Sequence, residues 1–501
     1  MNLAGTYENR AELLGRYRLN WPTLLIPERI RPSHHEQDLD TRNVFEQDYH
    51  RIILSASFRR LQDKTQVFPL DQSDFVRTRL THSLEVSSLA RSLGQTVAHE
   101  LYFRNLDPSL SPELERELCD LLLASGLVHD IGNPPFGHYG ETTIRDWFRR
   151  HLPQLRYHDH SLAEWLSPAM QADFLEFEGN AQALRVLCKL HFLVDEHGMN
   201  LTLPLLHTLI KYPIASTQIQ PQNPDIRFHK MGYFQAEQAL FDRITTRCGT
   251  RSGGAPLETG CRHPLTYLLE AADDISYRTA DIEDAYKKGR FTYGQLLDEL
   301  QGSRGLAEVT ARDRADYLEL VAKLPELRRQ ADGREIRNPE LYALQNWLVR
   351  VQSRMIQESS QAFCDNYAAI MNGCFQQELF RGTGKLIMET LGDIATRYVF
   401  RSRLIVQLEI AANTIISGLL DKFVPACLYW DTADFDSLSS SLEPRLMEIV
   451  SDNYKASYRF YAQGQDEAGR LYLRLLLITD YICGMTDSFA KTLYQKINGI
   501  Y

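Results

Sequence analysis

Apolar residues recur three or four positions apart through most of this 501-residue chain, and this spacing limits the fold more than any other feature. Ala90, Leu93, Val97 and Leu101 form one such stripe, which is the spacing of an amphipathic helix. Alternating patterns of the kind that β-strands produce are scarce. The sequence therefore predicts a mainly α-helical protein.

Signals for helix ends support individual helices. Pro112 behind Ser111 is a favourable start for a helix that runs toward His129. A second helix is expected over residues 264–288, because Gly289 follows it and glycine commonly terminates helices. Longer helical patterns and loop-like stretches rich in small or polar residues are also present, the helices at 338–377, 386–428 and 469–496 and the loops at 213–228, 249–264 and 431–441. The first two loops are interpreted as insertions within one domain.

The composition limits the class of protein and its compartment. Acidic residues outnumber basic ones by 65 to 55, and the formal net charge of −10 disfavours a broad basic surface for nucleic acid. The eight cysteines form no CxxC pair, so reduced thiols are expected rather than a zinc knuckle or a disulfide scaffold. The N-terminal stretch lacks an apolar signal segment, and no uninterrupted apolar run reaches the roughly 18 residues of a membrane span. We therefore expect a soluble cytoplasmic protein with no membrane partner.

The stretch SGLVHDIGNPPFGHYGE, residues 125–141, concentrates reactive side chains. A leucine-rich helical pattern ends in His129 and Asp130, and the Gly-Asn-Pro-Pro-Phe-Gly that follows cannot continue a helix. His138 and Glu141 come directly after this turn. Two histidines and two carboxylates within 13 positions indicate chemistry rather than packing.

His82, the pair His129–Asp130 and the pair Asp273–Asp274 fall on three separate predicted helices. Facing helices of a bundle can supply inward nitrogen and oxygen ligands to a divalent cation, and this set suits Mn²⁺, Fe²⁺, Co²⁺ or Mg²⁺. Taken alone, His82 or an isolated His–Asp pair is better explained as a hydrogen-bonded structural group. The ordered set favours a metal site.

The order H…HD…D is similar to the signature of the HD superfamily of metal-dependent phosphohydrolases. Five blocks resemble, in the same order, the bacterial dGTPase branch, the deoxynucleoside triphosphate triphosphohydrolases: RRLQDKTQVFPL, VRTRLTHSLEV, HDIGNPPFGHYGE, EAADDISYRTADIED and DYICGMTD. The resemblance runs from about Arg51 to the C-terminal helix. It implies a mainly α HD-domain bundle, with a core over residues 1–300 that carries loop insertions. Residues 301–501 are expected to form a helical extension that packs on this core and contributes to the pocket or to an oligomer.

The resemblance also implies a metal-ligand set, which is His82, His129, Asp130 and Asp273. Asp273 is preferred over Asp274 because the family's Tyr and Asp follow the ligand by four and eight residues, where Tyr277 and Asp281 stand. Positions i, i+4 and i+8 form one stripe of a helix. The ligand, the aromatic ring and the second carboxylate are therefore expected to face the same cavity.

His138 and Glu141 are the expected catalytic pair. The turn before them ends the metal-bearing helix and redirects the chain, so both side chains can return toward the metal. A bound divalent cation lowers the pKa of water and polarises a phosphoryl oxygen. As the family implies, His138 supported by Glu141 then orients or deprotonates the attacking water. The alternative for Glu141 is a first-turn carboxylate that the helix dipole stabilises.

A triphosphate is strongly anionic and needs cations around it. Arg79 shares the helical face of His82. Lys211, in LIKYP, stands at a helix end beside a Pro-rich loop, and a solvated lysine explains it nearly as well. The family also draws an arginine from the C-terminal half, for which the alternatives are Arg350, Arg397, Arg401 and Arg445.

Three residues are expected at the sugar. The family places a glutamine, here Gln66, and an aspartate, here Asp281, at the 3′-hydroxyl of the deoxyribose. Its tyrosine, here Tyr277, packs beneath the sugar and leaves no room for a 2′-hydroxyl. The alternative for Tyr277 is ordinary core packing on an amphipathic helix.

The resemblance implies hydrolysis of a dNTP, dGTP above all, to the deoxynucleoside and inorganic triphosphate, with water attacking the α-phosphorus. Another HD phosphohydrolase, a phosphodiesterase or a nucleoside monophosphatase, is the first alternative. The second is a non-enzymatic HD protein that senses nucleotides or binds single-stranded DNA, although the intact ligand set argues against an inactive enzyme. The family also implies a homo-oligomer, with a hexamer as the expected size.

Overall fold

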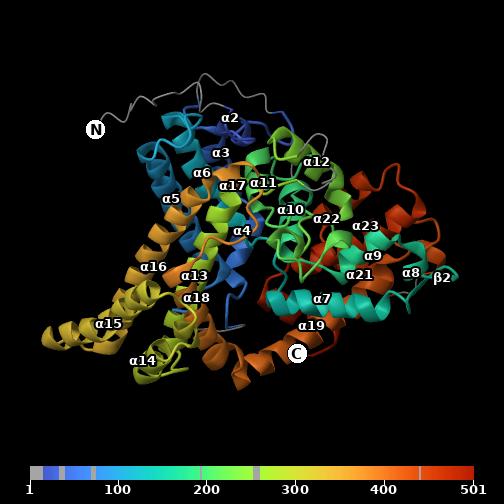
Figure 1. Cartoon of the computed structure of the whole chain (residues 1–501). Coiled ribbons are helices and arrows are strands. Elements are labelled where there is room, and N and C mark those ends of the chain that lie inside the picture. Colours follow the sequence, from blue (N-terminus) through green and yellow to red (C-terminus); the bar gives the residue numbers. More distant parts are fainter. Residues whose placement is uncertain are drawn as a thin grey trace.

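The computed structural model describes residues 15–32, 40–68, 75–191, 195–251, 260–438, 440 and 442–500. Helices make up almost all of the regular structure, which confirms the predicted mainly α fold (Figure 1). Within these residues the only strands form one small antiparallel sheet, in which β1 (Arg156–Tyr157) pairs with β2 (His160–Ser161).

Two long helices, α5 (Arg79–Phe103) and α6 (Pro112–Val128), pack side by side and carry the first site residues. Gly126 makes their close approach possible, because a Cβ atom there would lie 2.4 Å from the backbone of Ser87. The C-terminal end of α6 therefore lies beside the first turns of α5. The other helical segments of this region are α2 (Trp21–Leu24), α3 (Val44–Ile53), α4 (Ala56–Arg60), η1 (Leu61–Asp63) and α7 (His138–His151).

Shorter elements connect α7 to the long helix α13 (Pro264–Lys287). The predicted loop at 213–228 contains two short 3-10 turns, and residues 252–259 of the predicted loop at 249–264 lie outside the described residues. The connecting elements are α8 (Leu162–Trp165), α9 (Pro168–Leu175), α10 (Gly179–Arg185), the π-helix η2 (Val186–Leu190), α11 (Leu203–Leu209), η3 (Ser216–Gln218), η4 (Ile226–Phe228), η5 (Gln235–Glu237) and α12 (Gln238–Arg247).

The C-terminal part divides the three long helical patterns into shorter helices. In Figure 1 the helices α14 to α16 project to one side as an arm, while α19 packs against α7. The predicted loop at 431–441 contains the single-turn helix α20. The elements are α14 (Tyr293–Gln301), η6 (Arg304–Ala307), α15 (Ala311–Gly333), α16 (Pro339–Asp365), α17 (Tyr367–Met371), α18 (Gly382–Ala395), the π-helix η7 (Thr396–Phe400), α19 (Arg403–Cys427), α20 (Phe435–Leu438), α21 (Glu443–Ile449), α22 (Asp452–Tyr461), α23 (Glu467–Cys483) and α24 (Asp487–Ile497).

Two hydrophobic clusters form the interior, and α13 belongs to both. Leu268 and Ala272 pack in the larger cluster, whereas Ile275 and Ile282 pack in the second, which lies under the arm and α18. Asp273 stands between these two sets, so the helix presents this carboxylate where the clusters meet. The division of the chain at residue 300 stays a prediction.

Local predictions of helix ends are confirmed. The Ser111 side chain accepts a hydrogen bond from the Leu114 amide, and Pro112 is the first residue of α6. Helix α13 ends at Lys287, and Gly289 has the positive φ of 63° that favours glycine. All eight cysteines are unpaired, as predicted.

One helix among the described residues, Ile405–Cys427 within α19, is long and apolar enough to cross a membrane. Its apolar run is interrupted by Glu409 and Asp421. Half of its most apolar stretch is buried inside the protein, where α19 packs against α7, α21, α23 and α24. Core helices of soluble proteins share these properties, so α19 is weak evidence for a membrane contact.

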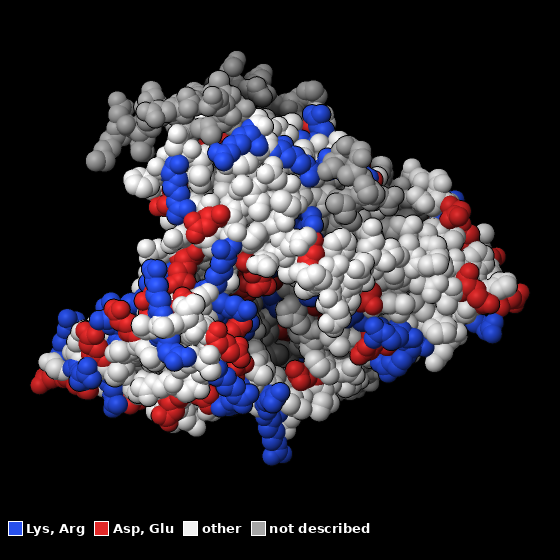
Figure 2. All heavy atoms as spheres, in the orientation of Figure 1, with Lys and Arg blue, Asp and Glu red and all other residues white. Residues whose placement is uncertain are grey.

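Charged side chains of both signs are mixed on the face shown in Figure 2. Lys and Arg lie among Asp and Glu over the arm, and the described residues of this face form no continuous basic surface. This distribution agrees with the formal net charge of −10.

Candidate active site

Three helices bring two histidines and two aspartates together. His82 lies near the start of α5, His129 directly follows α6, and Asp273 lies in the middle of α13. Asp273 Oδ1 is 3.1 Å from His82 Nε2 and 3.3 Å from His129 Nε2. Asp130 Oδ2 lies 3.7 Å from His129 Nε2. The four predicted metal ligands therefore converge on one point.

Asp273 and Asp274 are distinguished by their surroundings. Only Asp273 contacts the histidines, and the charges of His129 and Lys211 hold its pKa well below the usual range although burial opposes this shift. Asp274 lines the adjoining cavity, and burial raises its pKa to about 8. The geometry therefore agrees with the preference for Asp273.

The ring nitrogens that face away from the cluster have their own contacts. His129 Nδ1 lies 2.8 Å from the Gly126 carbonyl oxygen, and His82 Nδ1 lies 3.3 Å from Ser276 Oγ. Contacts at Nδ1 orient an imidazole and leave Nε2 for a metal. His129 Nε2 is buried without a well-formed hydrogen bond to any described residue. Burial lowers the pKa of His129, but the charges of Asp130 and Asp273 outweigh it and raise this pKa.

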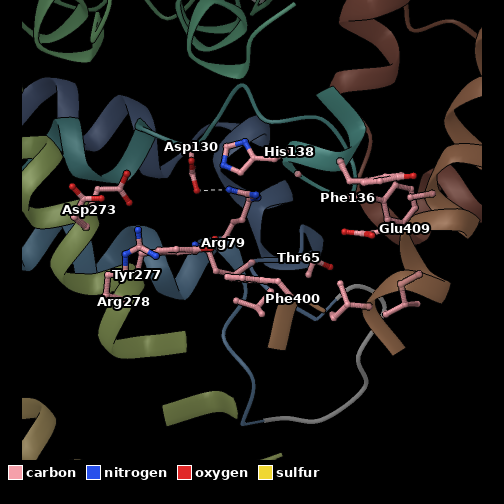
Figure 3. Close-up of a pocket in the computed structure, with 18 residues that line it drawn as sticks. Thr65, Arg79, Asp130, Phe136, His138, Asp273, Tyr277, Arg278, Phe400 and Glu409 are labelled. Carbon is pink, nitrogen blue, oxygen red and sulfur yellow. Dashed lines mark hydrogen bonds and ion pairs between the residues drawn. The ribbon is translucent and has the colours of Figure 1, made fainter. Parts of the chain in front are cut away.

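Two cations neutralise the two aspartates. Arg79 Nη1 donates to Asp130 Oδ2, the ion pair drawn in Figure 3, and Asn133 Nδ2 donates to Asp130 Oδ1 at 2.6 Å. Burial opposes ionisation of Asp130, but Arg79 holds its pKa below the usual range. Lys211 Nζ donates to Asp273 Oδ2 at 3.2 Å. Both predicted phosphate-binding cations thus lie at the cluster.

The donor set fits a divalent cation. Ligand atoms of His82, His129 and Asp130 lie within 4.8 Å of one another, and Asp273 Oδ1 contacts both imidazoles. Two nitrogen and two carboxylate donors suit first-row divalent metals, and a metal would also give the buried His129 Nε2 a partner. These residues can therefore hold such an ion.

The turn between the cluster and α7 depends on two residues with positive φ. Phe136 has φ 64° and Gly137 has φ 61°. A Cβ atom at Gly137 would lie 2.6 Å from Arg79 Nη2, so glycine is needed beside the guanidinium as well as for the backbone conformation. This turn places His138 at the start of α7, facing the cluster (Figure 3).

His138 and Glu141 form a hydrogen-bonded pair. His138 Nδ1 lies 3.0 Å from Glu141 Oε2, and Glu141 Oε1 accepts a hydrogen bond from the Gly179 amide at 2.8 Å. The His138 side chain is 76% exposed, whereas that of Glu141 is buried. The hydrogen bond and charge of Glu141 raise the pKa of His138. Glu141 thus contacts His138 and the first residue of α10, which the helix-dipole alternative does not explain.

A cavity of about 420 Å³ adjoins the cluster (Figure 3). Charged groups, among them Arg79, Asp130 and Asp273, lie on one side of it. Phe136 and Glu409 lie on the other side in Figure 3. The residues that line it are Thr65, Gln66, Val67, Arg79, Asp130, Phe136, Gly137, His138, Tyr139, Asp273, Asp274, Tyr277, Arg278, Phe400, Ile405, Leu408, Glu409 and Ala412.

The three predicted sugar-binding residues differ in their position. Gln66 and Tyr277 line the cavity, but Asp281 is not among the described residues that do so. Asp281 is fully buried one helical turn beyond Tyr277, which corrects the expectation that the whole stripe faces the cavity. Gln66 Oε1 has no hydrogen-bond partner among the described residues. Burial raises the pKa of Asp281 well above its usual value.

The far wall of the cavity was not predicted from the sequence. It comes from η7 and the first turns of α19, and none of the four arginines named as alternatives is among the described residues that line the cavity. Arg397 pairs with Glu299, and Arg350 lines a separate depression. An amphipathic helix pattern carries no signal that separates a cavity wall from a core. The residues of this wall are Phe400, Ile405, Leu408, Glu409 and Ala412.

Comparisons with known proteins agree with the geometry. The HD domain family matches residues 79–187. A deoxyguanosinetriphosphate triphosphohydrolase-like protein of Listeria monocytogenes is 45% identical over 96% of this chain and 100% of its own length. A protein of the same description from Synechocystis is 33% identical over 96% and 100%. A deoxyguanosinetriphosphate triphosphohydrolase of Serratia proteamaculans is 32% identical over 93% of this chain and 96% of its own.

The helical fold, the His and Asp cluster and the match to the HD domain define an HD-domain hydrolase. Identity over nearly the whole chain is more specific than the domain match. The chain belongs to the deoxyguanosinetriphosphate triphosphohydrolase family.

Proposed function

We propose that this protein hydrolyses dGTP to deoxyguanosine and inorganic triphosphate with the help of a bound divalent metal. The observation that carries the proposal is the opening of the His–Asp cluster into a cavity that is charged on one side and carries apolar side chains and Glu409 on the other. Such a cavity can take phosphates beside the cluster and a base at the far wall. The names of the relatives support the same substrate.

His82, His129, Asp130 and Asp273 would hold the metal, with Mn²⁺, Fe²⁺, Co²⁺ and Mg²⁺ as candidates. When bound, such an ion supplies Lewis-acid stabilisation of phosphoryl charge and makes water more acidic. The Nδ1 contacts of both imidazoles support this role, because they leave the Nε2 atoms directed at the cluster.

His138 acts on the attacking water. Its Nδ1 is held by Glu141, so Nε2 is the ring nitrogen left for the cavity. The neutral imidazole accepts a proton from water as the α-phosphorus is attacked, and Glu141 stabilises the imidazolium that forms. Glu141 is itself held by the Gly179 amide, which limits movement of the pair.

Arg79 and Lys211 stabilise the triphosphate. Each already contacts an aspartate of the cluster. Arg79 also lines the cavity, so its guanidinium lies beside the space that a phosphate group would occupy. The leaving triphosphate develops negative charge, and cations placed beforehand lower the cost of that charge.

The sugar lies against α13. Tyr277 lines the cavity and packs beneath the ring, where a 2′-hydroxyl would clash with it or be buried without a partner. Gln66 lines the cavity and its Oε1 has no partner among the described residues, which supports a contact with the 3′-hydroxyl, since a buried acceptor normally has a donor. The exclusion of a 2′-hydroxyl by Tyr277 selects deoxynucleotides, whereas the 3′-hydroxyl is common to both kinds of nucleotide.

Replacing Tyr277 by Ala is expected to reduce the preference for dGTP over GTP. An unsatisfied buried hydroxyl costs about 1–3 kcal/mol, so the preference should fall by about tenfold or more. The measurement is the ratio of kcat/KM for the two nucleotides. Tyr277→Phe keeps the ring and should keep the wild-type ratio; an unchanged ratio in Tyr277→Ala would assign the ring to core packing.

Glu409 is a candidate for base selection. It stands on the far wall, and burial raises its pKa. Guanine presents two neighbouring donors, N1–H and the N2 amino group, to such a carboxylate. The same edge of adenine presents an unprotonated N1. The position of Glu409 therefore supports the preference for dGTP.

Glu409→Ala is expected to lower the preference for dGTP over dATP. Hydrogen bonds to a charged acceptor contribute about 1.5–3 kcal/mol, which corresponds to about tenfold or more in the ratio of kcat/KM. Competition between the two nucleotides in one reaction measures this ratio directly. Leu408→Ala, on the same wall, is the control that removes apolar contact without the acceptor; equal losses in both variants would exclude base reading by Glu409.

The reaction itself is tested by chromatography of the products that purified protein forms from each dNTP and from GTP with Mn²⁺ or Mg²⁺. Inorganic triphosphate together with the deoxynucleoside supports the proposal. Orthophosphate, or cleavage of a phosphodiester only, would instead identify another HD phosphohydrolase. Nucleotide or single-stranded DNA binding without turnover would identify a sensor. A cytoplasmic homo-oligomer, with six subunits as the expected size, stays a prediction.

A further inference from the structure

The last of the five sequence blocks, DYICGMTD, ends in Asp487, and none of the roles above uses this residue. Asp487 is the first residue of α24 and is only 1% exposed. Its carboxylate does not contact the metal cluster in this structure. It binds two loops that lie about 350 and 420 positions earlier in the chain.

Each oxygen of Asp487 holds a different loop. Oδ1 accepts a hydrogen bond from the Phe136 amide at 2.9 Å. Oδ2 accepts one from the Thr65 amide at 3.1 Å and another from the Thr65 hydroxyl. Three donors from two loops are therefore joined through one buried carboxylate.

Both loops border the cavity. Thr65 directly precedes Gln66, the predicted sugar contact, and both line the cavity. Phe136 precedes Gly137 and His138, and all three line it as well. Phe136 also has a positive φ of 64°, a conformation that non-glycine residues adopt only when surrounding contacts stabilise it. The hydrogen bond that the Phe136 amide donates to Asp487 is such a contact.

Lys64 connects the same three segments independently. Its buried Nζ donates to the Asn133 carbonyl at 2.5 Å and to the Cys483 carbonyl at 2.7 Å. Its own carbonyl accepts from the Arg79 amide at 3.0 Å. Hydrogen bonds therefore connect the end of α23 and the start of α24 both to the loop that contains Gln66 and to the turn before His138.

A carboxylate at a helix start can simply favour the helix dipole. Asp487 differs from that case, because its recorded hydrogen bonds go to two distant loops rather than to the first turn of α24. Both carboxylate oxygens of Asp487 accept hydrogen bonds, and together they receive the three donors of Thr65 and Phe136. The side-chain NH₂ of an asparagine would face a donor of one of the two loops and could not accept its hydrogen bond. The Asp487→Asn substitution therefore removes the contact with one loop while keeping the size of the side chain.

We propose that Asp487 is a positioning residue that sets the distance between the sugar contact Gln66 and the catalytic His138 across the cavity. The proposal rests on the proposed function for its catalytic consequence, but not for its structural one. Catalytic groups displaced by about 1 Å can lose about 100-fold in rate. Losing either loop contact would allow such a displacement.

The test compares Asp487→Asn and Asp487→Ala with the wild-type protein loaded with Mn²⁺. Hydrogen–deuterium exchange is followed in peptides that cover residues 60–68 and 130–138, at temperatures well below unfolding. Both peptides are expected to exchange faster in Asp487→Ala, while metal content stays unchanged. At saturating dGTP, kcat is expected to fall by about 10- to 100-fold. Discrimination between dGTP and its 3′-deoxy analogue is expected to fall as well.

Ser488→Ala is the matched control. Ser488 lies next to Asp487 in the first turn of α24, but its hydroxyl donates to Asp63, outside the cavity. Because Asp63 belongs to the 60–68 peptide, only that peptide is expected to exchange faster in Ser488→Ala. Residues 130–138 should exchange as in the wild type, and kcat should stay unchanged. If Asp487→Ala and Asp487→Asn leave both peptides protected as in the wild type, or loosen only residues 483–490, the positioning role is overturned. Should the wild type not hydrolyse any dNTP, the proposed function fails while the exchange data still decide the role of Asp487.

Discussion

Replacing His129 or Asp130 by Ala is expected to abolish both metal binding and turnover. His129 Nε2 and the Asp130 carboxylate form one cluster with His82 and Asp273. Loss of either ligand removes the Lewis acid from the reaction, and with it the acidified water. Metal content by mass spectrometry and triphosphate release at saturating dGTP are the two measurements. A variant that kept a full metal complement and the wild-type rate would show that the site is assigned to the wrong residues.

The fold must be checked separately, because Asp130 also neutralises a buried arginine. Arg79 is 4% exposed, and breaking a buried ion pair by removing one partner costs about 3–5 kcal/mol. Asp130→Asn keeps an oxygen that can accept from Arg79 and therefore separates loss of the ligand from loss of stability. Asp274→Asn is the matched control for metal binding. Asp274 is next to Asp273 in the chain, but its carboxylate does not contact the histidines. The Asp274→Asn variant should therefore retain the metal.

Replacing His138 by Ala is expected to lower kcat by about 10²–10⁴-fold with the metal still bound, since a positioned general base contributes about that much. The His138 side chain faces the cavity and makes no contact with the four predicted ligands among its recorded hydrogen bonds and ion pairs. Steady-state kinetics and metal content on the same preparation make the measurement. Loss of the metal would make His138 a ligand, and an unchanged kcat would make it a structural residue.

The pH profile provides a second check on His138. Glu141 raises the pKa of His138, and a general base is active only when neutral, so the rate falls as pH drops through this raised pKa. Glu141→Gln removes the negative charge and lowers that pKa. The acidic limb of kcat/KM should therefore move to lower pH in Glu141→Gln. A limb that stayed in place would mean that another group titrates there.

Local sequence signals predicted helices well because their causes are local. Ser111 and Pro112 begin α6 through bonds within one turn, and the apolar stripe of α5 packs as its spacing requires. The π-helical break at Thr396–Phe400 was not foreseen. It lies within a continuous helical pattern, so no residue type in the sequence marks it.

Much of the metal cluster was also readable from the sequence. Short spacings identify the HD pair and the helix that carries Asp273, Tyr277 and Asp281. The order of the sequence blocks indicates which residues share the metal site. Which atoms meet is a different matter. The pairing of Arg79 with Asp130, and the burial of Asp281 beyond the cavity, depend on how α5, α6 and α13 pack.

By itself, then, the sequence determined the helical class, the main helix ends, the family and the set of candidate ligands, because spacing and residue type express these properties within a few turns. The far wall of the cavity at Phe400 and Glu409, and the link from Asp487 to Thr65 and Phe136, were decided only by the tertiary structure. These contacts join segments hundreds of residues apart. Which residues meet depends on how whole helices pack, and no local sequence pattern indicates that packing.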